Sequence, residues 1–577
     1  MLIAIIQDGR TWRCFAEPVQ VITAVTPEEV WPALRAVETA VSQQHLYAAG
    51  FLTYEAAAAF GLAVHPPGDL PLLWFGLYKQ SGQQEIGESF NRPITQLPNY
   101  SISNWQPAVS QSAYHVAIRQ IKEAIARGDT YQVNYTFPMR AEFTGDPLAL
   151  FADLAQAQQG SYAAYVDTGR FVVCSASPEL FFRLDGEVLT SKPMKGTAVR
   201  GKTLAEDEAN IAWLAQSEKN RAENVMIVDM IRNDMGRVAE IGSMQVPELF
   251  AVERYPTVLQ MTSTVRARTR RPLLEIFQAM FPCASITGAP KVRTMEIIRE
   301  LEPQPRGVYT GAIGFISPDR TAQFNVAIRT VTVDRERGAA VYGVGSGIIW
   351  DSDAAAEYAE CQVKARVLAE KRPSFQLLES LLWRPGEGYF LLEAHLRRLA
   401  DSGVYFAVPL DSTAVRDELT RFALSLTEPC KIRLLVSPTG EMEMEAVPLA
   451  RGAWPQPLHV ALADTAVSSE NVWLYHKTTR REWHDAARAA RPDCDEVILW
   501  NEWGELTEAT TANLVLNVDG ELLTPSVSCG LLAGTFRNYL LANGRIRERI
   551  LTKADLRRAR RIFLINSVRR WQTAVLV

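Results

Sequence analysis

Lys195 stands in a sequence setting that predicts chemistry. It lies between Pro193 and Gly196, and this pattern predicts a stiff turn that holds the lysine side chain in place. A lysine amine becomes a nucleophile when burial or neighbouring charges lower its pKa. Glu179 follows a predicted strand earlier in the chain, and its carboxyl group could act as a general acid. The two residues together predict covalent catalysis that is assisted by proton transfer.

Further along the chain, carboxylates and a guanidinium could bind a small dianion. Glu223 and Glu360 lie in two predicted helices and could give oxygen ligands to one Mg²⁺, which also accepts a substrate carboxylate. Arg329 could contact a carboxylate through two hydrogen bonds. Amides of a predicted glycine loop at Gly345 and Gly347 could bind a second carboxylate. Each residue alone also fits a surface ion pair or an ordinary turn, so the prediction depends on their combination.

A second group of residues matches the requirements of one cofactor. Lys477 could bind pyridoxal phosphate covalently, and Glu508 could pair with the nitrogen of its pyridine ring. A helix is predicted to begin at Gly534 and Thr535, where backbone donors could hold a phosphate. Taken singly, these residues are a surface lysine, a capping glutamate and a common helix start. Together they predict a pyridoxal phosphate site.

The clearest joint in the chain lies at residues 370–374. A long helical pattern ends there, and Pro373 is a residue that stops a helix. A new apolar alternation begins at Phe375. We therefore divide the chain into residues 1–371 and residues 374–577. The first part is larger than a typical domain with a single core.

Helices and strands are predicted in mixed order, which favours an α+β fold over a doubly wound sheet. In the second part, a two-residue Asp519-Gly520 sequence between apolar runs is a strong signal for a hairpin. The predicted strands cover residues 171–174, 311–315, 331–333, 339–342, 496–500, 514–518 and 521–525, and the predicted helices cover residues 204–220 and 221–231.

The composition excludes several classes of protein. The chain has 577 residues, of which 47% are hydrophobic and 22% charged, and its net charge of -5 gives no sign of nucleic-acid binding. No apolar run is long enough to predict a membrane helix, and no secretory signal is visible at the start. Seven cysteines without paired spacing predict reduced thiols and a cytoplasmic protein, and no zinc motif is present.

Residues from about 120 to 370 resemble the chorismate-utilising enzymes. The resemblance implies an α+β chorismate-binding fold with two facing β-sheets and helices outside them. The first 115 residues resemble the family less distinctly. The segments that carry the resemblance are residues 177–179, 193–197, 232–234, 285–291, 309–314 and 345–347.

The same resemblance implies a reaction. Family members that form anthranilate have alanine at the position that corresponds to Lys195. Members that form 4-amino-4-deoxychorismate have lysine there, and this chain resembles them. Lys195 is then expected to attack C2 of chorismate as the C4 hydroxyl leaves, after which ammonia adds at C4 and expels the lysine. Glu179 is expected to protonate the departing hydroxyl, and Glu223 and Glu360 are expected to bind Mg²⁺. The positions implied to hold chorismate are Gly196, Thr197, Tyr309, Arg329, Gly345 and Gly347.

Two features of the sequence concern substrate binding and the source of ammonia. Gln260 replaces a histidine that many relatives have, and a glutamine at a substrate-binding position can donate a hydrogen bond but cannot titrate. No Gly-x-Cys-x-Gly segment is present, so the chain is expected to lack glutaminase activity. Ammonia is expected from a separate glutamine amidotransferase subunit, as in relatives, with free ammonium as the alternative supply.

Residues from about 375 to 577 resemble the class IV aminotransferase family of pyridoxal phosphate enzymes. The resemblance implies a fold-type IV α+β domain in which Lys477 carries the cofactor and moves protons, and Glu508 pairs with the ring nitrogen. Alanine at position 509, where relatives usually have glycine, and a missing opening segment are departures from the family. The residues implied to hold the phosphate are Arg398, Gly534, Thr535 and Ser567.

The two resemblances together imply a bifunctional enzyme of folate precursor synthesis. The first half would aminate chorismate, and the second half would eliminate pyruvate from 4-amino-4-deoxychorismate to give 4-aminobenzoate. One alternative is an anthranilate- or salicylate-type enzyme whose second half is a decayed domain or a transaminase. Another is that the second half is a non-catalytic docking module for an amidotransferase. Class IV relatives usually form dimers, so a homodimer is one assembly that the sequence leaves open.

Overall fold

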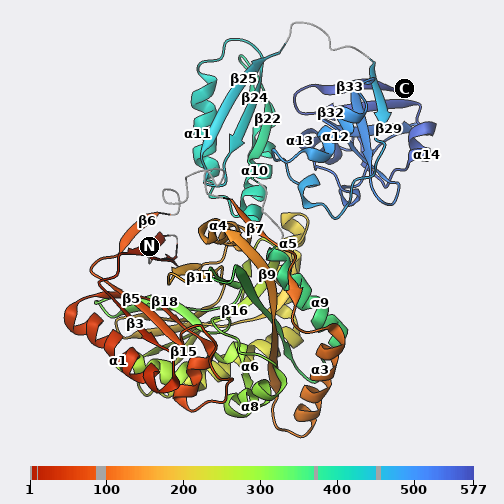
Figure 1. The fold of residues 1–577 in the computed structure, drawn as a ribbon. Helices are drawn as coiled ribbons and strands as arrows, with labels where there is room; N and C mark the ends of the chain where they lie inside the picture. The colour runs from red at the N-terminus through yellow and green to blue at the C-terminus, as the bar shows by residue number, and fades with distance from the viewer. Residues whose placement is uncertain (1–2, 10, 86–98, 369–373, 450–456) are drawn as a thin grey trace. The chain divides into compact units, whose positions relative to one another are not determined.

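The computed structural model describes residues 3–9, 11–85, 99–368, 374–449 and 457–577. These residues group into two compact units, shown as ribbons in Figure 1. The first unit comprises residues 1–199 and 211–372, and the second comprises residues 200–210 and 373–577. Most of the joint expected at residues 370–374 lies outside the described residues.

The first unit contains two large, mainly antiparallel sheets. Most strands of the first sheet follow one continuous order of neighbours, which we call the main path. Two short strands, β7 (Tyr100–Ile102) and β8 (Gln106–Pro107), lie off this path and pair with β9 (Gln132–Gly145). The strand order along that path is β17 (Gly288–Ala289), β9 (Gln132–Gly145), β21 (Ala339–Ile348), β20 (Thr330–Asp334), β11 (Phe171–Ser175), β10 (Ala164–Asp167), β1 (Ile3–Asp8), β2 (Thr11–Ala16) and β6 (Gly82–Glu85).

In the second sheet β15 (Gln245–Arg254) pairs with β16 beside the main path. The order along the path is β14 (Met194–Val199), β16 (Val258–Arg268), β13 (Val188–Lys192), β12 (Leu180–Asp185), β19 (Thr321–Val326), β18 (Ala312–Ile316), β4 (Tyr47–Leu52), β5 (Leu73–Tyr78) and β3 (Gln20–Ala24).

Three apolar clusters explain why the two sheets face each other. Side chains of β1, β10 and β11 pack against those of β4, β5 and β18 in one cluster between the sheets. The outer face of the second sheet packs against helices α1 (Pro27–Gln44), α6 (Glu218–Gly236) and α7 (Leu273–Met280). The outer face of the first sheet packs against α3 (Gln111–Ala126), α4 (Pro147–Gln158), α8 (Lys291–Leu301) and α9 (Ala354–Ala365). The expected α+β architecture of two facing sheets with helices outside is confirmed.

The boundary between the two predicted helices at residues 204–231 differs from the expectation. Helix α5 (Leu204–Gln216) ends before Ser217, and α6 begins after it. The Ser217 hydroxyl accepts a hydrogen bond from the Asn220 amide, which is the usual role of a serine at a helix N-cap. The predicted break at Asn220 is therefore wrong by three residues, because the capping serine and not the polar run ends the helix.

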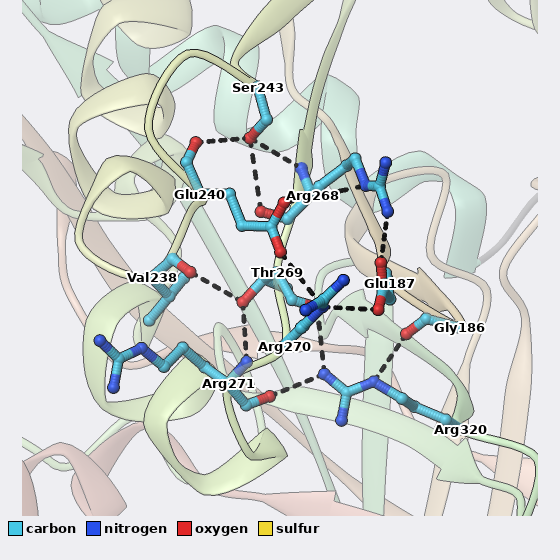
Figure 2. Close-up of polar contacts among 10 residues, drawn as sticks. All are labelled: Gly186, Glu187, Val238, Glu240, Ser243, Arg268, Thr269, Arg270, Arg271 and Arg320. Atoms are coloured by element: carbon cyan, nitrogen blue, oxygen red, sulfur yellow. Dashed lines mark hydrogen bonds and ion pairs between the residues drawn. The ribbon is translucent and has the colours of Figure 1, made fainter.

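A network of arginines fixes one end of the second sheet, as Figure 2 shows. Glu187, in the turn between β12 and β13, accepts hydrogen bonds from Arg268 and Arg270 near the end of β16. Arg320, in the turn between β18 and β19, donates to the carbonyls of Gly186 and Arg271. The network therefore joins two turns and a strand end that lie far apart in the sequence.

The second unit contains a four-stranded and an eight-stranded sheet. A hairpin joins β29 and β30 through Asp519 and Gly520, whose φ values of +53° and +92° match the predicted two-residue turn. The four-stranded sheet has the order β23 (Gly388–Tyr389), β22 (Leu377–Arg384), β24 (Cys430–Val436) and β25 (Met442–Pro448). The eight-stranded sheet has the order β28 (Leu506–Ala509), β27 (Glu496–Trp500), β26 (Leu458–Leu462), β33 (Arg570–Leu576), β32 (Arg561–Asn566), β29 (Asn513–Val518), β30 (Glu521–Thr524) and β31 (Arg547–Glu548).

Helices α10 and α11 cover one face of the four-stranded sheet, where a cluster of apolar side chains is buried. None of the helices in the described part of the chain is both long enough and apolar enough to cross a bilayer. The helices of this unit are α10 (Leu392–Phe406), α11 (Ser412–Ala423), α12 (Glu482–Ala490), α13 (Thr535–Ala542) and α14 (Lys553–Arg558).

Residues 200–210 are part of the second unit although they follow β14 in the sequence. The Tyr405 hydroxyl donates to the Gly201 carbonyl at 2.7 Å, and the Arg200 guanidinium lies over the Tyr405 ring. His476 contacts the Lys202 carbonyl at 3.1 Å. These contacts involve buried side chains, so the segment is an integral part of this unit.

Candidate active sites

Lys195 lies on a strand, not on the turn that its Pro and Gly neighbours predict. From Met194 to Thr197 strand β14 takes three steps while its partner β16 takes two, which marks a β-bulge at Lys195. Gly196 has a φ of +101°, a conformation that favours glycine. The prediction of a turn was wrong because the sequence around Lys195 does not reveal its pairing with β16.

Two predicted metal ligands lie near the Lys195 amine. An oxygen of Glu223, on α6, is 3.7 Å from Nζ of Lys195. Glu360, on α9, forms an ion pair with Lys364 at 2.6 Å. Burial raises the pKa of Glu360, but the charge and hydrogen bond of Lys364, together with the charges of Lys195 and Arg329, lower it overall. Both carboxylates therefore act electrostatically on the same amine.

Asn224 holds the backbone of Lys195, although the sequence did not single it out. Its side-chain amide donates to the Lys195 carbonyl at 3.1 Å, and its amide oxygen accepts from the Ser263 hydroxyl at 2.6 Å. Asn224 is buried and directly follows Glu223 on α6. The same turn of helix therefore presents one carboxylate to the amine and fixes the strand that carries it.

Glu179 has the properties of a general acid. It lies just before β12, and its side chain is buried with one carboxyl oxygen that has no hydrogen-bond partner among the described residues. Burial raises its pKa to about 7, against the smaller opposing effects of a hydrogen bond from Ser285 and the charge of Lys195. A carboxyl group with a pKa of about 7 is protonated in a substantial fraction of the molecules at neutral pH and can donate its proton.

The raised pKa of Glu179 predicts how the rate of the expected amination would depend on pH. At a fixed concentration of unprotonated ammonia, the rate is expected to fall as pH rises through about 7, because the acid loses its proton. Glu179→Gln cannot titrate, so it should lose this dependence and lower kcat by about 10²- to 10⁴-fold. Steady-state rates of amination measured from pH 5.5 to 9 test both expectations.

A matched control for this prediction is Glu55→Gln. Burial also raises the pKa of Glu55 to about 7, but its carboxylate accepts hydrogen bonds from the backbone of Arg306 and Gly307 and does not contact Lys195. The control should keep the decline in rate above pH 7. If the Glu179 variant keeps the decline and the Glu55 variant loses it, the assignment of Glu179 as the acid is wrong.

Gly345 and Gly347 lie in the interior of strand β21, not in the loop that the sequence predicts. They pair with Thr136 and Asn134 of β9 in an unbroken register. A Cβ atom at Gly347 would lie 2.9 Å from Nζ of Lys195, so the glycine leaves room for the amine. The expectation of loop amides was wrong because close approach, rather than a turn, explains these glycines.

Gln132 is a residue of this site that sequence reasoning missed. A Cβ atom at Gly347 would also lie 3.1 Å from Nε2 of Gln132, which places the amide beside the Lys195 amine. Gln132 is 1% exposed, and neither polar atom of its side chain has a partner among the described residues. A buried amide without partners is costly unless a ligand satisfies it. A polar residue at the start of a buried strand was the available signal.

Gln260 and Thr197 form hydrogen bonds with each other and with the bulge. The Thr197 hydroxyl donates to the Gln260 side-chain oxygen at 3.0 Å, and the Gln260 amide donates to the Gly196 carbonyl at 2.8 Å. In this structure the glutamine that replaces the family's histidine therefore supports the segment next to Lys195.

Tyr309 and Arg329 lie at positions of special backbone geometry. The Tyr309 ring occupies the space above Gly343, where a Cβ atom would lie 2.1 Å from it. Thr310 and Arg329 have φ values of +62° and +52°, which are uncommon for residues with side chains. The Arg329 guanidinium donates to the Lys364 carbonyl. Such conformations cluster at functional sites, where the surrounding structure maintains them.

The residues present can accommodate Mg²⁺. No group of three or more His, Cys, Asp or Glu side chains suited to a metal occurs among the described residues. Mg²⁺ is usually bound by one or two carboxylates and keeps several waters, so Glu223 and Glu360 are sufficient in number. A third oxygen donor would come from the substrate carboxylate.

In the second unit, Lys477 lies in a cavity of about 550 Å³. Its amine is buried, and burial lowers its pKa to about 8, with a further contribution from the charge of Arg398. At neutral pH the amine can therefore exchange a proton with modest cost. Predicted site residues that line this cavity are Arg398, Lys477, Glu508, Gly534, Thr535 and Ser567.

The expected phosphate-binding residues surround one end of the cavity. Arg398 donates two hydrogen bonds to Glu379, and its Nη1 has no partner among the described residues. Gly534 is the N-cap of α13, and a Cβ atom there would clash with the side chain of Asn513. The Thr535 hydroxyl lies 3.2 Å from Nε2 of His395. This end combines a guanidinium with free backbone donors, and it fits a phosphate.

Glu508 lies on β28 and is buried. One of its oxygens lies 3.2 Å from Nε2 of His484, and the other accepts from the Asn513 amide at 3.3 Å. A buried carboxylate whose contacts leave acceptor sites free can accept a hydrogen bond from the N–H of a pyridinium ring. The cavity therefore fits pyridoxal phosphate at its lysine, its carboxylate and its phosphate end.

A cationic wall, which we define as Lys431, Arg433, Arg481 and Arg569, lines the same cavity and was not predicted. On β24 the residues alternate, so that Ile432 and its neighbours of the same face are buried in the core while Lys431 and Arg433 face the other way. Burial lowers the pKa of Lys431, and the three arginines of the wall lower it further. The wall therefore offers a positive surface that attracts anions.

The comparisons with known proteins agree with this architecture. The family model described as "chorismate binding enzyme" matches residues 3–370. The chain belongs to the chorismate-binding enzymes. The match includes the N-terminal residues, whose sequence resembles the family less distinctly. A second family model, described as "Amino-transferase class IV", matches residues 376–576 of this chorismate-binding enzyme.

Two curated relatives resemble this chain in sequence, and one solved structure resembles it in fold. Aminodeoxychorismate synthase component 1 of Bacillus subtilis is 37% identical over 51% of this chain and 65% of its own length. The Escherichia coli protein of the same name is 42% identical over 45% of this chain and 57% of its own length. Anthranilate synthase component I of Streptococcus pneumoniae, at 24% identity, shares the fold with a TM-score of 0.56 over 63% of this chain and 92% of its own. The chain thus spans between half and two thirds of the length of these two curated relatives.

Proposed function

We propose that the protein converts chorismate to 4-aminobenzoate in two reactions. The first unit would add ammonia at C4 of chorismate and release water, giving 4-amino-4-deoxychorismate. The second unit would break this product into 4-aminobenzoate and pyruvate. The observation that carries the proposal is that each unit holds one lysine among partly or fully buried charged groups: Lys195 beside Glu223, and Lys477 inside a cationic cavity.

In the first reaction Lys195 would form a bond to C2 of chorismate as the C4 hydroxyl departs. Glu179 would supply the proton that turns the hydroxyl into water, and its raised pKa supports that role. Ammonia would then form a bond at C4 and break the bond between C2 and the lysine. Mg²⁺ held by Glu223 and Glu360 would supply positive charge for a substrate carboxylate.

In the second reaction Lys477 would move protons within the cavity. Pyridoxal phosphate, when bound, supplies an electron-withdrawing ring for the substrate carbon that bears nitrogen. Lys477 would take the proton from that carbon, and a proton returned to the methylene group would release the enolpyruvyl group as pyruvate. A pKa of about 8 suits an amine that both accepts and returns a proton near neutral pH.

The cationic wall supports an acidic substrate for the second unit. Arg398 would bind the phosphate of the cofactor, and Glu508 would pair with its ring nitrogen. The cations of the wall therefore remain to bind the substrate. A substrate with two carboxylates, such as 4-amino-4-deoxychorismate, would be recognised by several cations, whereas an apolar amino acid would offer these cations no carboxylate beyond its own.

Replacing cations of the wall is expected to weaken substrate binding without loss of the cofactor. Lys431→Gln and Arg433→Gln should each raise the KM of pyruvate release by about 10-fold, since a charged hydrogen bond contributes roughly 1.5–3 kcal/mol. The absorbance of bound pyridoxal phosphate should stay unchanged. Arg547→Gln, at an exposed pair with Glu521 outside the cavity, is the matched control. An unchanged KM in both wall variants would contradict this role.

Ammonia is proposed to come from a glutamine amidotransferase partner, with free ammonium as a substitute in the test tube. The name "component 1" of the relatives supports a second component that supplies it. Rates measured with ammonium and with glutamine, in the presence and absence of an added amidotransferase, distinguish the two supplies.

A product assay tests the proposed function. The purified protein is incubated with chorismate, Mg²⁺, ammonium and pyridoxal phosphate, and the products are separated by mass spectrometry. Equal amounts of 4-aminobenzoate and pyruvate are expected. Accumulation of 4-amino-4-deoxychorismate alone would retain the first reaction and reject the second, and anthranilate would show that the assignment of Lys195 is wrong.

A further inference from the structure

His484 lies beside the carboxylate that is proposed to pair with the cofactor ring. Its Nε2 is 3.2 Å from one oxygen of Glu508, and the two side chains come from α12 and β28. Both residues are more than nine-tenths buried and both line the cavity around Lys477. Neither the sequence pattern nor the family resemblance assigned a role to this histidine.

The contact with His484 is the shortest that Glu508 makes in the described part of the chain. The Leu532 amide donates to the same oxygen at 3.4 Å, and the Asn513 side chain donates to the other oxygen at 3.3 Å. Both distances are longer than usual hydrogen bonds between nitrogen and oxygen. The imidazole therefore makes the closest of the three contacts that orient the carboxylate.

The chemistry of the pair fixes the direction of the hydrogen bond. A carboxylate only accepts hydrogen bonds, so we assign a proton to Nε2 of His484. Nδ1 of His484 is buried without a partner among the described residues. The histidine is therefore held in the cavity wall by its contact with Glu508 and not by a competing polar group on its other nitrogen.

We propose that His484 is a positioning residue that holds one oxygen of Glu508, so that the other oxygen faces the ring nitrogen of pyridoxal phosphate. This inference rests on the proposed cofactor site. Donation from Nε2 stabilises the ionised carboxylate, and an ionised carboxylate in turn stabilises the protonated form of the ring nitrogen. Without His484 the two weaker contacts would leave the carboxylate free to rotate.

Two substitutions of His484 distinguish the length of the side chain from its polarity. His484→Gln places an amide N–H close to the position of Nε2, whereas His484→Asn carries the same amide about one bond short of Glu508. His459→Asn serves as a control, because His459 lies on β26, is largely exposed and does not line the cavity. Far-UV circular dichroism establishes that the variants are folded.

Two measurements on the full-length protein test the inference without relying on activity. The Kd of pyridoxal phosphate for the apoprotein is obtained from quenching of tryptophan fluorescence, and the absorbance spectrum of the bound cofactor reports the state of its ring. His484→Asn should raise Kd by about 10-fold and change the absorbance spectrum, since a charge-assisted hydrogen bond is lost. His484→Gln and His459→Asn should stay within about twofold of the unmodified protein.

Each outcome decides between the two proposals. Equal Kd values and spectra for His484→Asn and the unmodified protein would overturn the role of His484 and leave the cofactor site intact. Equal impairment of the Asn and Gln variants, with both folded, would also overturn it, because reach to Glu508 would then not matter. Failure of the unmodified protein to bind pyridoxal phosphate would overturn the proposed site together with this inference.

Discussion

Lys195→Ala is expected to abolish the formation of 4-amino-4-deoxychorismate, with a fall in kcat of at least about 1,000-fold. The amine lies 3.7 Å from Glu223 and faces the space left by Gly347, and alanine cannot form the bond to C2 that the proposed reaction needs. Product formation from chorismate, Mg²⁺ and ammonium, followed by mass spectrometry, measures the effect. The substitution removes few packing contacts, so the melting temperature should change little.

Lys219→Ala is the matched control for this loss. Lys219 is an exposed residue of α6, one helical turn before Glu223, and its removal also takes one positive charge from the neighbourhood of the carboxylate. The control should keep at least half of the activity. Unchanged product formation by Lys195→Ala would reject the covalent mechanism, and equal loss in both variants would mean that net charge alone is responsible.

Lys477→Ala is expected to eliminate pyruvate release and the absorbance of covalently bound pyridoxal phosphate. The amine lines the cavity, and burial lowers its pKa to about 8, so it is suited both to the bond with the cofactor and to proton transfer. The rate should fall by at least about 1,000-fold. Amination of chorismate by the first unit should continue, and 4-amino-4-deoxychorismate should accumulate.

Lys553→Ala tests whether any lysine of the second unit gives the same result. Lys553 begins α14 and lies over the Trp500 ring, outside the cavity. This variant should retain the cofactor absorbance and pyruvate release. Persistence of the absorbance in Lys477→Ala would show that the cofactor is bound elsewhere, and loss in both variants would indicate a general effect on folding.

The elements that could be predicted from the sequence are those whose signals are local. Asp519 and Gly520 take up positive φ values in the expected hairpin, and a helix begins at Thr535 after Gly534, as the sequence predicts. The strand at residues 171–174 and the α+β class also agree with the structure. In each case neighbouring residues alone determine the backbone conformation.

Features that depend on distant partners could not be predicted in the same way. Lys195 was expected on a turn, because proline and glycine favour turns, but β16 is more than 60 residues further along the chain and pairs with its segment. Gly347 was expected in a loop for the same reason. The functional prediction for these residues rested on their types and their order in the sequence. In the structure Lys195 and Gly347 still lie next to each other, although both are on strands.

Residues that the sequence did not single out are those whose role lies in what surrounds them. Lys431 and Arg433 alternate with apolar residues, but the sequence does not say which face of β24 meets the cavity. Gln132 and His484 are ordinary polar residues until their burial and their unpartnered atoms are known. Such roles depend on tertiary packing, which could not be predicted from this single sequence.

The assignment of residues 200–210 to the second unit has a consequence for dividing the protein into separate polypeptides. The chain passes from one unit to the other at residues 199/200, 210/211 and 372/373, so a single cut at the joint does not separate complete units. A fragment of residues 374–577 would lack the carbonyls that partner Tyr405 and His476. Because His476 directly precedes Lys477, transplanting the proposed second activity onto another protein would require residues 200–210 to be carried with it.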